Sequence, residues 1–301
     1  MKPYALVLTS SPAAPALTPA IADRALAPLS ESTRGKATWL CESEAWQVQF
    51  SAADDGEADR IRATVAAALA DLPIDVNVVP DDTSRRKKLL VADMESTIIE
   101  QECLDELADH IGLRDRIADI TARAMRGEVA FEAALKERVG LLKGLDADVL
   151  EKLYDRITLV PGARELVATM RTNGAYCALV SGGFTFFTER IAARLGFNSH
   201  QANTLDIVDG RLAGTVSPPI LGREAKLAAL ERLVGELSLQ PEETLAVGDG
   251  ANDLDMIRAA GLGVAFRAKP IVAAKAKASI RYGDLTALLY LQGYSRKEFA
   301  R

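Results

Sequence analysis

Three short, unbroken apolar runs constrain the fold of this 301-residue chain more than any other feature. They lie at residues 89–92, 176–180 and 244–247. Runs without polar alternation are typical of strands that are buried on both faces of a parallel sheet. Because helical patterns separate and follow these runs, the chain from residue 85 onward is predicted to form an α/β domain with a doubly wound parallel sheet.

Two regions depart from this alternation of strands and helices. Residues 103–158 show helix-like patterns only, which predicts an all-helical insertion soon after the first buried strand. Residues 1–82 predict a small α+β domain of the ferredoxin-like type, with the order strand, helix, strand, strand, helix, strand. The expected strands are 4–9, 38–41, 46–50 and 74–79, and the expected helices 20–29 and 57–72. Breaker and turn residues at 80–84 indicate a boundary, so we expect domains at 1–82 and 85–301.

Composition argues against several classes of protein. The net charge is −6, which gives no support to a nucleic-acid partner. The basic run at residues 85–88 is interpreted as a solvated linker edge rather than a binding patch. No apolar stretch approaches the roughly 18 residues that a membrane span needs. Three widely separated cysteines fit reduced thiols, so we expect a soluble, cytoplasmic protein.

Polar and small residues follow each of the three apolar runs. Their sequences are Asp93-Met94-Glu95-Ser96-Thr97, Ser181-Gly182-Gly183 and Gly248-Asp249-Gly250-Ala251-Asn252-Asp253. Taken singly, each is explained as well by a helix cap or a turn. The carboxyl ends of strands in an open parallel sheet converge on one crevice, where ligands bind. The joint occurrence of the three motifs therefore predicts a single functional site.

These residue types suit phosphoryl transfer. A phosphate monoester is negatively charged, so attack by a carboxylate such as Asp93 needs neutralising cations. Mg²⁺ bound by oxygen ligands such as Asp93 and Asp249 supplies one cation, and a lysine is the natural second. Backbone amides beside glycines can donate to phosphoryl oxygens, and Glu95 can act as general acid and base. The two histidines, His110 and His200, lie outside these motifs.

The motifs resemble those of the haloacid dehalogenase-like hydrolases, and among them the phosphoserine phosphatase family. The resemblance covers residues 85–295, about two-thirds of the chain, and rests on residues 90–97, 180–184, Lys226 and 248–254. It implies that Asp93 is the nucleophile that becomes phosphorylated. It implies Mg²⁺ ligation by the Asp93 side chain, the Glu95 carbonyl and Asp249, with Asp253 in support. It further implies that the phosphoryl group is held by Ser181, Gly182, Lys226 and Asn252.

By the same resemblance, the helical insertion is a cap over the site. Residues 131–139 are similar to the cap of the phosphoserine phosphatase family. The resemblance implies that Glu102 contacts a substrate ammonium and that Arg138 contacts its carboxylate, a task that a planar guanidinium suits. Met125 and Phe131 would complete an apolar wall. The implied reaction hydrolyses O-phospho-L-serine to L-serine and phosphate, the last step of serine biosynthesis.

One position departs from the family pattern. The family has aspartate two residues after the nucleophile, where this chain has Glu95. The extra methylene moves the carboxyl by roughly 1 Å, and a misplacement of that size can be costly. Two alternatives therefore stay open: a phosphatase of another small phosphate monoester, and a non-catalytic ligand sensor.

The first 82 residues resemble the small ACT-like regulatory domains that precede some phosphoserine phosphatases. The resemblance rests on the order of elements and their position in the chain. Three roles stay open for this part: binding an amino acid, pairing two copies into a homodimer, and packing against the catalytic domain.

Overall fold

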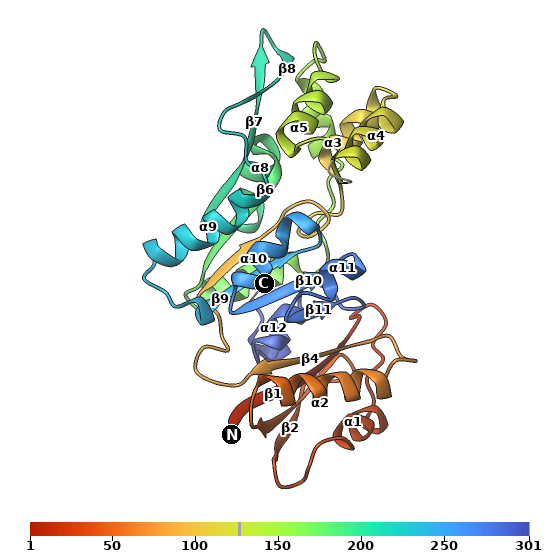
Figure 1. Ribbon diagram of the computed structural model, residues 1–301, viewed down its shortest axis with the longest axis vertical. Helices are drawn as coiled ribbons and strands as arrows, with labels where there is room; N and C mark the ends of the chain where they lie inside the picture. The colour runs from red at the N-terminus through yellow and green to blue at the C-terminus, as the bar shows by residue number, and fades with distance from the viewer. Residues whose placement is uncertain (126–127, 301) are drawn as a thin grey trace.

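The computed structural model describes the backbone of residues 1–125 and 128–300, and the side chains of residues 1–123 and 128–300. Three parts follow one another along the long axis of the molecule (Figure 1). At one end lies the N-terminal sheet with two helices, and in the middle a larger sheet flanked by helices. A group of helices beside a long hairpin forms the other end.

The N-terminal sheet has four antiparallel strands in the order β2-β3-β1-β4. Its elements are β1 (Lys2–Ser10), α1 (Pro19–Leu26), β2 (Arg34–Cys41), β3 (Ala45–Ala52), α2 (Asp55–Ala68) and β4 (Ile74–Pro80). This is the predicted βαββαβ order. In β1, Leu6 and Leu8 pack toward α1 and α2, whereas Ala5 and Val7 belong to the core of the large sheet. The alternation of side chains along a strand explains how one strand serves two cores.

The large sheet has seven strands in the order β11-β10-β9-β5-β6-β7-β8. They are β5 (Leu89–Ala92), β6 (Tyr176–Phe184), β7 (Ser199–Val208), β8 (Arg211–Ser217), β9 (Thr244–Gly248), β10 (Leu262–Phe266) and β11 (Ala278–Ile280). All neighbouring pairs are parallel except β7 and β8. The prediction of a mostly parallel α/β fold is confirmed, and the three apolar runs form the central strands β9, β5 and β6.

Helices cover both faces of this sheet, which explains why its central strands are apolar throughout. In β5, Leu89 and Val91 pack with α9 (Arg223–Glu236) and α10 (Leu254–Ala259). On the other face, Leu90 and Ala92 pack in the core that contains α7 (Ala163–Thr172), α8 (Thr185–Leu195) and α12 (Ala287–Leu291). The polar residues at the carboxyl end of β5 are therefore held by a strand that is fixed from both sides.

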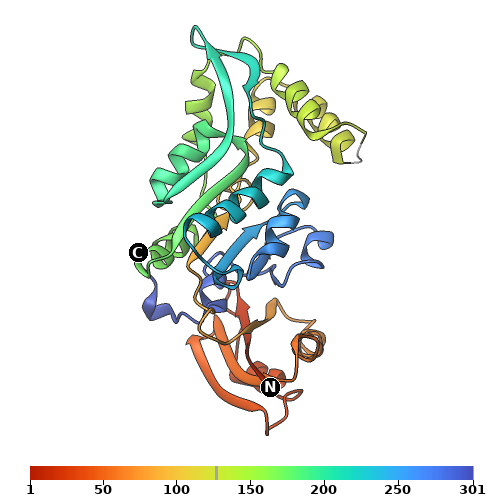
Figure 2. The same cartoon turned by 60° about the vertical axis from the view of Figure 1, so that its left-hand side comes forward.

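The insertion after β5 contains α3 (Cys103–His110), α4 (Arg114–Met125), α5 (Phe131–Gly140) and α6 (Asp148–Tyr154). The hairpin β7–β8, which was not predicted, runs alongside these helices (Figure 2). Backbone hydrogen bonds tie the two together: Gly144 donates to Leu212 O, and Leu212 donates to Leu145 O, both at 2.8 Å. The helical insertion is thus anchored to the sheet through the hairpin as well as through its own two connections.

Buried polar side chains join the N-terminal sheet to the large sheet. On β4, Asp75 accepts hydrogen bonds from the backbone N–H groups of Arg281 and Gly283 at 2.8 Å. Asn77 donates to Ser279 O at 3.0 Å and accepts from its N–H at 2.9 Å. Asp75 and Asn77 thus supply side-chain hydrogen bonds to the backbone of β11 and of the loop after it, in place of a β-ladder. These bonds hold β4 against β11.

The linker between the two sheets is part of this interface. Arg85 and Lys87 are each only 7% exposed, so the interpretation of residues 85–88 as a solvated edge is wrong for these two. Arg85 Nε donates to Leu291 O at 3.0 Å, and Lys87 Nζ donates to Glu242 O at 2.7 Å. The basic residues thus satisfy backbone carbonyls of the large sheet and its neighbouring segments.

Within the described ranges, no helix combines the length and the apolar character needed to cross a bilayer.

Candidate active site

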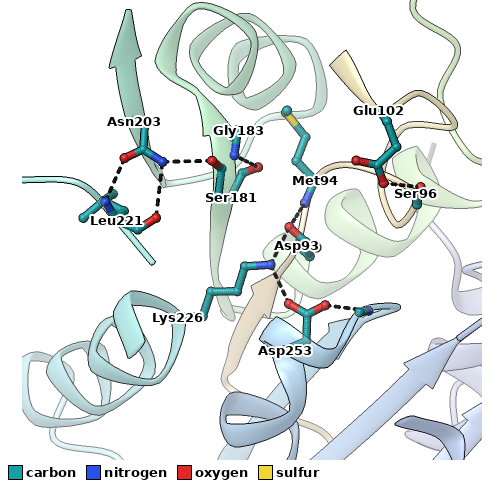
Figure 3. A network of polar contacts seen from close by, with 12 residues as sticks. Asp93, Met94, Ser96, Glu102, Ser181, Gly183, Asn203, Leu221, Lys226 and Asp253 are labelled. Carbon is teal, nitrogen blue, oxygen red and sulfur yellow. Dashed lines mark hydrogen bonds and ion pairs between the residues drawn. The ribbon is translucent and has the colours of Figure 1, made fainter. Parts of the chain in front are cut away.

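Lys226 lies at the centre of a buried ion cluster at the carboxyl ends of β5 and β9 (Figure 3). Its Nζ is 2.8 Å from Asp93 Oδ1 and 2.5 Å from Asp253 Oδ1. Asp93 directly follows β5, and its Oδ1 also accepts from the N–H of Met94 at 2.8 Å. Asp253 Oδ2 accepts from the N–H of Gly250 at 2.9 Å. Two carboxylates from distant parts of the chain therefore share the charge of Lys226.

The electrostatics of the cluster favour a charged lysine. Burial lowers the pKa of Lys226, but the carboxylates of Asp93 and Asp253 outweigh it and leave the pKa above its usual value. Burial, together with the charge of Asp253, raises the pKa of Asp93. Burial and the same charge raise the pKa of Asp249 to about 6. The site thus holds more negative than positive charge, which favours the binding of a further cation.

Asp93, Asp249 and Asp253 form a donor set that fits a divalent metal ion. Each offers a carboxylate oxygen, and these atoms lie within 4.8 Å of one another. Hard divalent cations prefer oxygen ligands, and Asp249 is accessible enough to complete a site that is open to a ligand. The predicted metal-binding carboxylates are therefore brought together.

Ser181, Gly182 and Gly183 lie at the end of β6, on the other side of Asp93. The pairing of β6 with β7 is irregular between Val180 and Phe184, so these residues depart from the ladder. Ser181 is 2% exposed, and its Oγ accepts from the N–H of Gly183 at 2.9 Å. A buried hydroxyl and glycine backbone at a strand end suit the binding of phosphoryl oxygens.

Glu95 lies between the strand ends and the cap. Its Oε1 accepts from the N–H of Cys103 at 2.8 Å, which satisfies the first amide of α3. A Cβ on Gly183 would lie 2.8 Å from Glu95 Oε2, so the carboxyl packs directly against the glycine backbone. Burial and the nearby charge of Glu102 raise the pKa of Glu95 to about 7. A carboxyl with such a pKa can give and take a proton near neutral pH.

Glu102 and Arg138 lie at the start of α3 and in α5, two helices of the insertion. Ser96 Oγ donates to Glu102 Oε1 at 2.7 Å. Arg138 Nη1 donates to Thr121 Oγ1 at 3.3 Å. Burial lowers the pKa of Arg138, and the charges of Asp105, Glu95 and Glu102 partly offset this effect. The printed contacts of Arg138 stay within the inserted helices, whereas Glu102 is tied to the loop that follows β5.

The remaining predicted residues border the same space. The ring of Phe131 lies over glycine backbone, because a Cβ on Gly222 would be 3.4 Å from it and one on Gly182 3.9 Å. Asn252 is half-buried beside Gly250, in the short helix η2 (Ala251–Asp253) that also carries Asp253. The side chain of Met125, at the end of α4, lies outside the described part of the structure.

Comparisons with known proteins give the family. Residues 90–258 match the model for the family described as haloacid dehalogenase-like hydrolase. The chain belongs to this family. It is 44% identical over 80% of its length to the phosphoserine phosphatase of Streptomyces coelicolor, and the match spans 59% of that relative. It is 45% identical over 67% of its length to the phosphoserine phosphatase of Streptococcus thermophilus, of which it covers 94%.

A solved structure extends the likeness to the whole chain. The unliganded probable phosphoserine phosphatase from Vibrio cholerae is 32% identical, with a TM-score of 0.78, over 98% of this chain and 88% of that one. The resemblance to the haloacid dehalogenase-like hydrolases that the motifs indicated is confirmed.

Asn203 is a site residue of this haloacid dehalogenase-like hydrolase that the sequence motifs did not reveal. It is 1% exposed on β7, and its Nδ2 donates to Gly182 O at 2.8 Å and to Leu221 O at 3.2 Å (Figure 3). Its Oδ1 accepts from the N–H of Leu221 at 2.7 Å. The amide therefore joins the Ser181–Gly183 segment to the loop that leads into α9, the helix of Lys226. A turn signal, Asp209-Gly210, could have identified the β7–β8 hairpin that carries it.

Proposed function

We propose that this hydrolase is a Mg²⁺-dependent phosphoserine phosphatase that acts through an aspartyl-phosphate on Asp93. The observation that carries the proposal is the position of Lys226, 2.8 Å from Asp93 and 2.5 Å from Asp253. A buried carboxylate beside a fixed cation suits attack on a phosphoryl group. We expect Glu102 and Arg138, on the inserted helices, to bind the ammonium and the carboxylate of an amino acid.

The metal proposal rests on the carboxylate cluster. We assign the side chains of Asp93 and Asp249 and the carbonyl of Glu95 as Mg²⁺ ligands, with Asp253 fixing Lys226. When bound, the ion neutralises phosphoryl charge, so that the anionic substrate and the anionic Asp93 can approach each other.

In the first half-reaction, one oxygen of the Asp93 carboxylate attacks phosphorus and the bond to the serine oxygen breaks. Glu95, protonated near neutral pH, donates its proton to the departing alkoxide, which leaves as the serine hydroxyl. Lys226, Ser181 and the backbone N–H groups of the glycine segment hold the phosphoryl oxygens, with Asn252 on the opposite side.

In the second half-reaction, ionised Glu95 takes a proton from water as the water oxygen attacks the phosphorus of the aspartyl-phosphate. The bond between phosphorus and the Asp93 oxygen breaks, inorganic phosphate leaves, and both carboxyls return to their starting states. Phe131 places an apolar ring beside the backbone of Gly182 and Gly222, on this face of the intermediate.

The direct test is phosphate release from O-phospho-L-serine by the purified chain, with Mg²⁺ and with EDTA. We expect turnover only with Mg²⁺, and none above background for Asp93→Asn, which keeps the shape of the side chain but removes the nucleophile. Turnover of p-nitrophenyl phosphate alone would retain the phosphatase and reject the substrate. No turnover of either compound, with ligand binding intact, would favour the non-catalytic sensor.

Two further proposals concern the molecule in the cell. We propose that it works in the cytoplasm, because Cys103 and Cys177 are buried as free thiols and Cys41 is also unpaired.

We also propose that two copies pair along the outer side of β2, an edge strand on which Trp39 is 36% exposed. Light scattering that gives the mass of a single chain at micromolar concentration would reject the pairing.

A further inference from the structure

The loop between β5 and the cap is closed by two hydrogen bonds that involve functional carboxylates. Glu95 Oε1 accepts from the N–H of Cys103 at 2.8 Å. One residue further in on each side, Ser96 Oγ donates to Glu102 Oε1 at 2.7 Å. The two bonds are nested, so the loop from 97 to 101 is held at both ends (Figure 3 shows the inner pair).

Glu102 occupies the N-cap position of α3, yet its side chain makes no capping hydrogen bond. An N-cap side chain that caps its helix accepts from the backbone N–H of the second or third helical residue, here Leu104 or Asp105. The Glu102 side chain accepts from the hydroxyl of Ser96, and Glu95 satisfies the amide of Cys103, the first residue of α3. The Glu102 carboxylate is therefore kept available for a ligand rather than for its own helix.

Ser96 makes this contact from a strained backbone. Its φ is +54°, in the left-handed region, where a residue with a Cβ is less stable than glycine. Glycine would meet the backbone requirement without that cost, but it would lack the hydroxyl. The combination of strain and a short bond to a charged partner indicates that the hydroxyl has a role at this position.

We propose that Ser96 is a positioning residue that sets the preference of this site for substrates bearing an ammonium group. The proposal rests on the proposed function, in which Glu102 receives the ammonium of O-phospho-L-serine. Donation from Ser96 to one carboxylate oxygen fixes the orientation of Glu102 and leaves the other oxygen to accept from the ammonium.

The test compares two substrates that differ only in the amino group, O-phospho-L-serine and 3-phosphooxypropanoate. Ser96→Gly removes the hydroxyl and relieves the strained φ. We expect its kcat/KM for O-phospho-L-serine to fall about tenfold, chiefly through KM, because hydrogen bonds to charged groups contribute on that scale. We expect its kcat/KM for 3-phosphooxypropanoate to stay unchanged. Ser96→Asn, which keeps a donor and tolerates the left-handed conformation, should recover part of the loss.

Ser238→Gly is the matched control. Ser238 also has a positive φ, +53°, but it lies in the loop after α9. Its replacement by glycine therefore relieves backbone strain while the hydrogen bond between Ser96 and Glu102 stays in place. Equal losses with both substrates would assign Ser96 a merely structural role and overturn the proposal. The proposal would also be overturned if the ratio of kcat/KM for the two substrates were the same in Ser96→Gly as in wild type. A wild-type protein that hydrolyses both substrates equally well would instead reject the proposed amino-acid substrate, a separate failure.

Discussion

At the scale of single residues, Glu95 connects the loop of the proposed nucleophile with the first helix of the cap. Its length allows Oε1 to reach the N–H of Cys103 at 2.8 Å while Oε2 packs against Gly183. We expect Glu95→Gln to lower kcat about 10²–10⁴-fold, because proton transfer is lost. Glu95→Asp keeps the proton but falls short of Cys103, so we expect a smaller loss, about tenfold. Phosphate-release kinetics at saturating substrate measure both.

If Glu95→Gln were as fast as wild type, Glu95 would have no part in acid–base catalysis. If Glu95→Asp were faster than wild type, the reach to Cys103 would hinder turnover rather than support it. Gly235→Ala is a suitable control, since a Cβ there meets nothing within 4 Å.

The raised pKa of Glu95 also predicts how stability depends on pH. Because the pKa rises from 4.5 to about 7 on folding, the folded protein holds this proton more tightly than the unfolded chain. This contribution to stability is complete below pH 4.5 and is lost as the pH rises to about 7. Glu95→Gln resembles the protonated form, so its stability relative to wild type should increase by about 3 kcal/mol over that interval. Urea denaturation in EDTA measures it, and a pH-independent difference would contradict the shift.

Lys226 is the countercharge for two buried carboxylates, Asp93 and Asp253. Removing one partner of a buried ion cluster leaves charge without compensation and costs about 3–5 kcal/mol. We therefore expect Lys226→Met to lower the free energy of unfolding by that amount in EDTA and to abolish phosphatase activity. Added Mg²⁺ should restore part of the stability but not the activity, because it replaces the charge without the contact to the phosphoryl group. A variant as stable as wild type in EDTA would show that the carboxylates are not both ionised.

At the scale of elements, two asparagines join β6 to its neighbourhood at opposite ends. Asn203 binds Gly182 O and both backbone groups of Leu221, next to the site. Asn198 accepts from the N–H of Cys177 at 2.9 Å, at the far end. We expect Asn203→Ala to lower the free energy of unfolding by about 1–3 kcal/mol, since it leaves partly buried backbone groups without a partner. Asn198→Ala should lower it less, because the Asn198 side chain is exposed and water can replace it. Only Asn203→Ala should also lower kcat, about tenfold or more, and equal kcat values for the two variants would contradict this assignment.

The difference between these asparagines and the acidic motifs explains what the sequence could predict. Buried parallel strands and the carboxylates that follow them are local patterns, so residues 89–97 and 244–253 indicated both the sheet and its crevice. Asn203 acts through partners 18 and 21 residues away, and such contacts leave no local pattern.

The strand β6 was expected to end at residue 180, because the glycines that follow resemble a turn, yet it continues irregularly to Phe184. Tertiary pairing with β7 decides this boundary rather than propensity.

At the scale of the whole molecule, the N-terminal sheet shares its core with the large sheet. Ala5, Val7 and Val79 lie in the same hydrophobic cluster as Leu288 and Leu289 of α12. Tyr290 of the same helix donates to Glu44 Oε1 at 2.7 Å. Because apolar and polar contacts both cross the boundary, we expect the two parts to unfold together rather than as separate domains.

The two tryptophans offer a test, because Trp39 and Trp46 both belong to the N-terminal sheet. Their fluorescence follows that sheet alone, whereas circular dichroism at about 222 nm follows the helices of the whole chain. We expect the two unfolding curves to coincide in wild type. Asp75→Ala leaves backbone N–H groups beside β11 without an acceptor. It should lower the free energy of unfolding by about 2 kcal/mol and shift both midpoints together to lower denaturant.

Asp71→Ala is the control for this last prediction, because its pair with Arg24 is exposed and contributes little. If the fluorescence midpoint came first in wild type, the N-terminal sheet would unfold on its own, and the buried contacts would not couple the two parts. If the curves coincided in wild type and separated only in Asp75→Ala, this one carboxylate would be what makes the boundary cooperative. Coincidence in both proteins would instead assign the cooperativity to the shared apolar core.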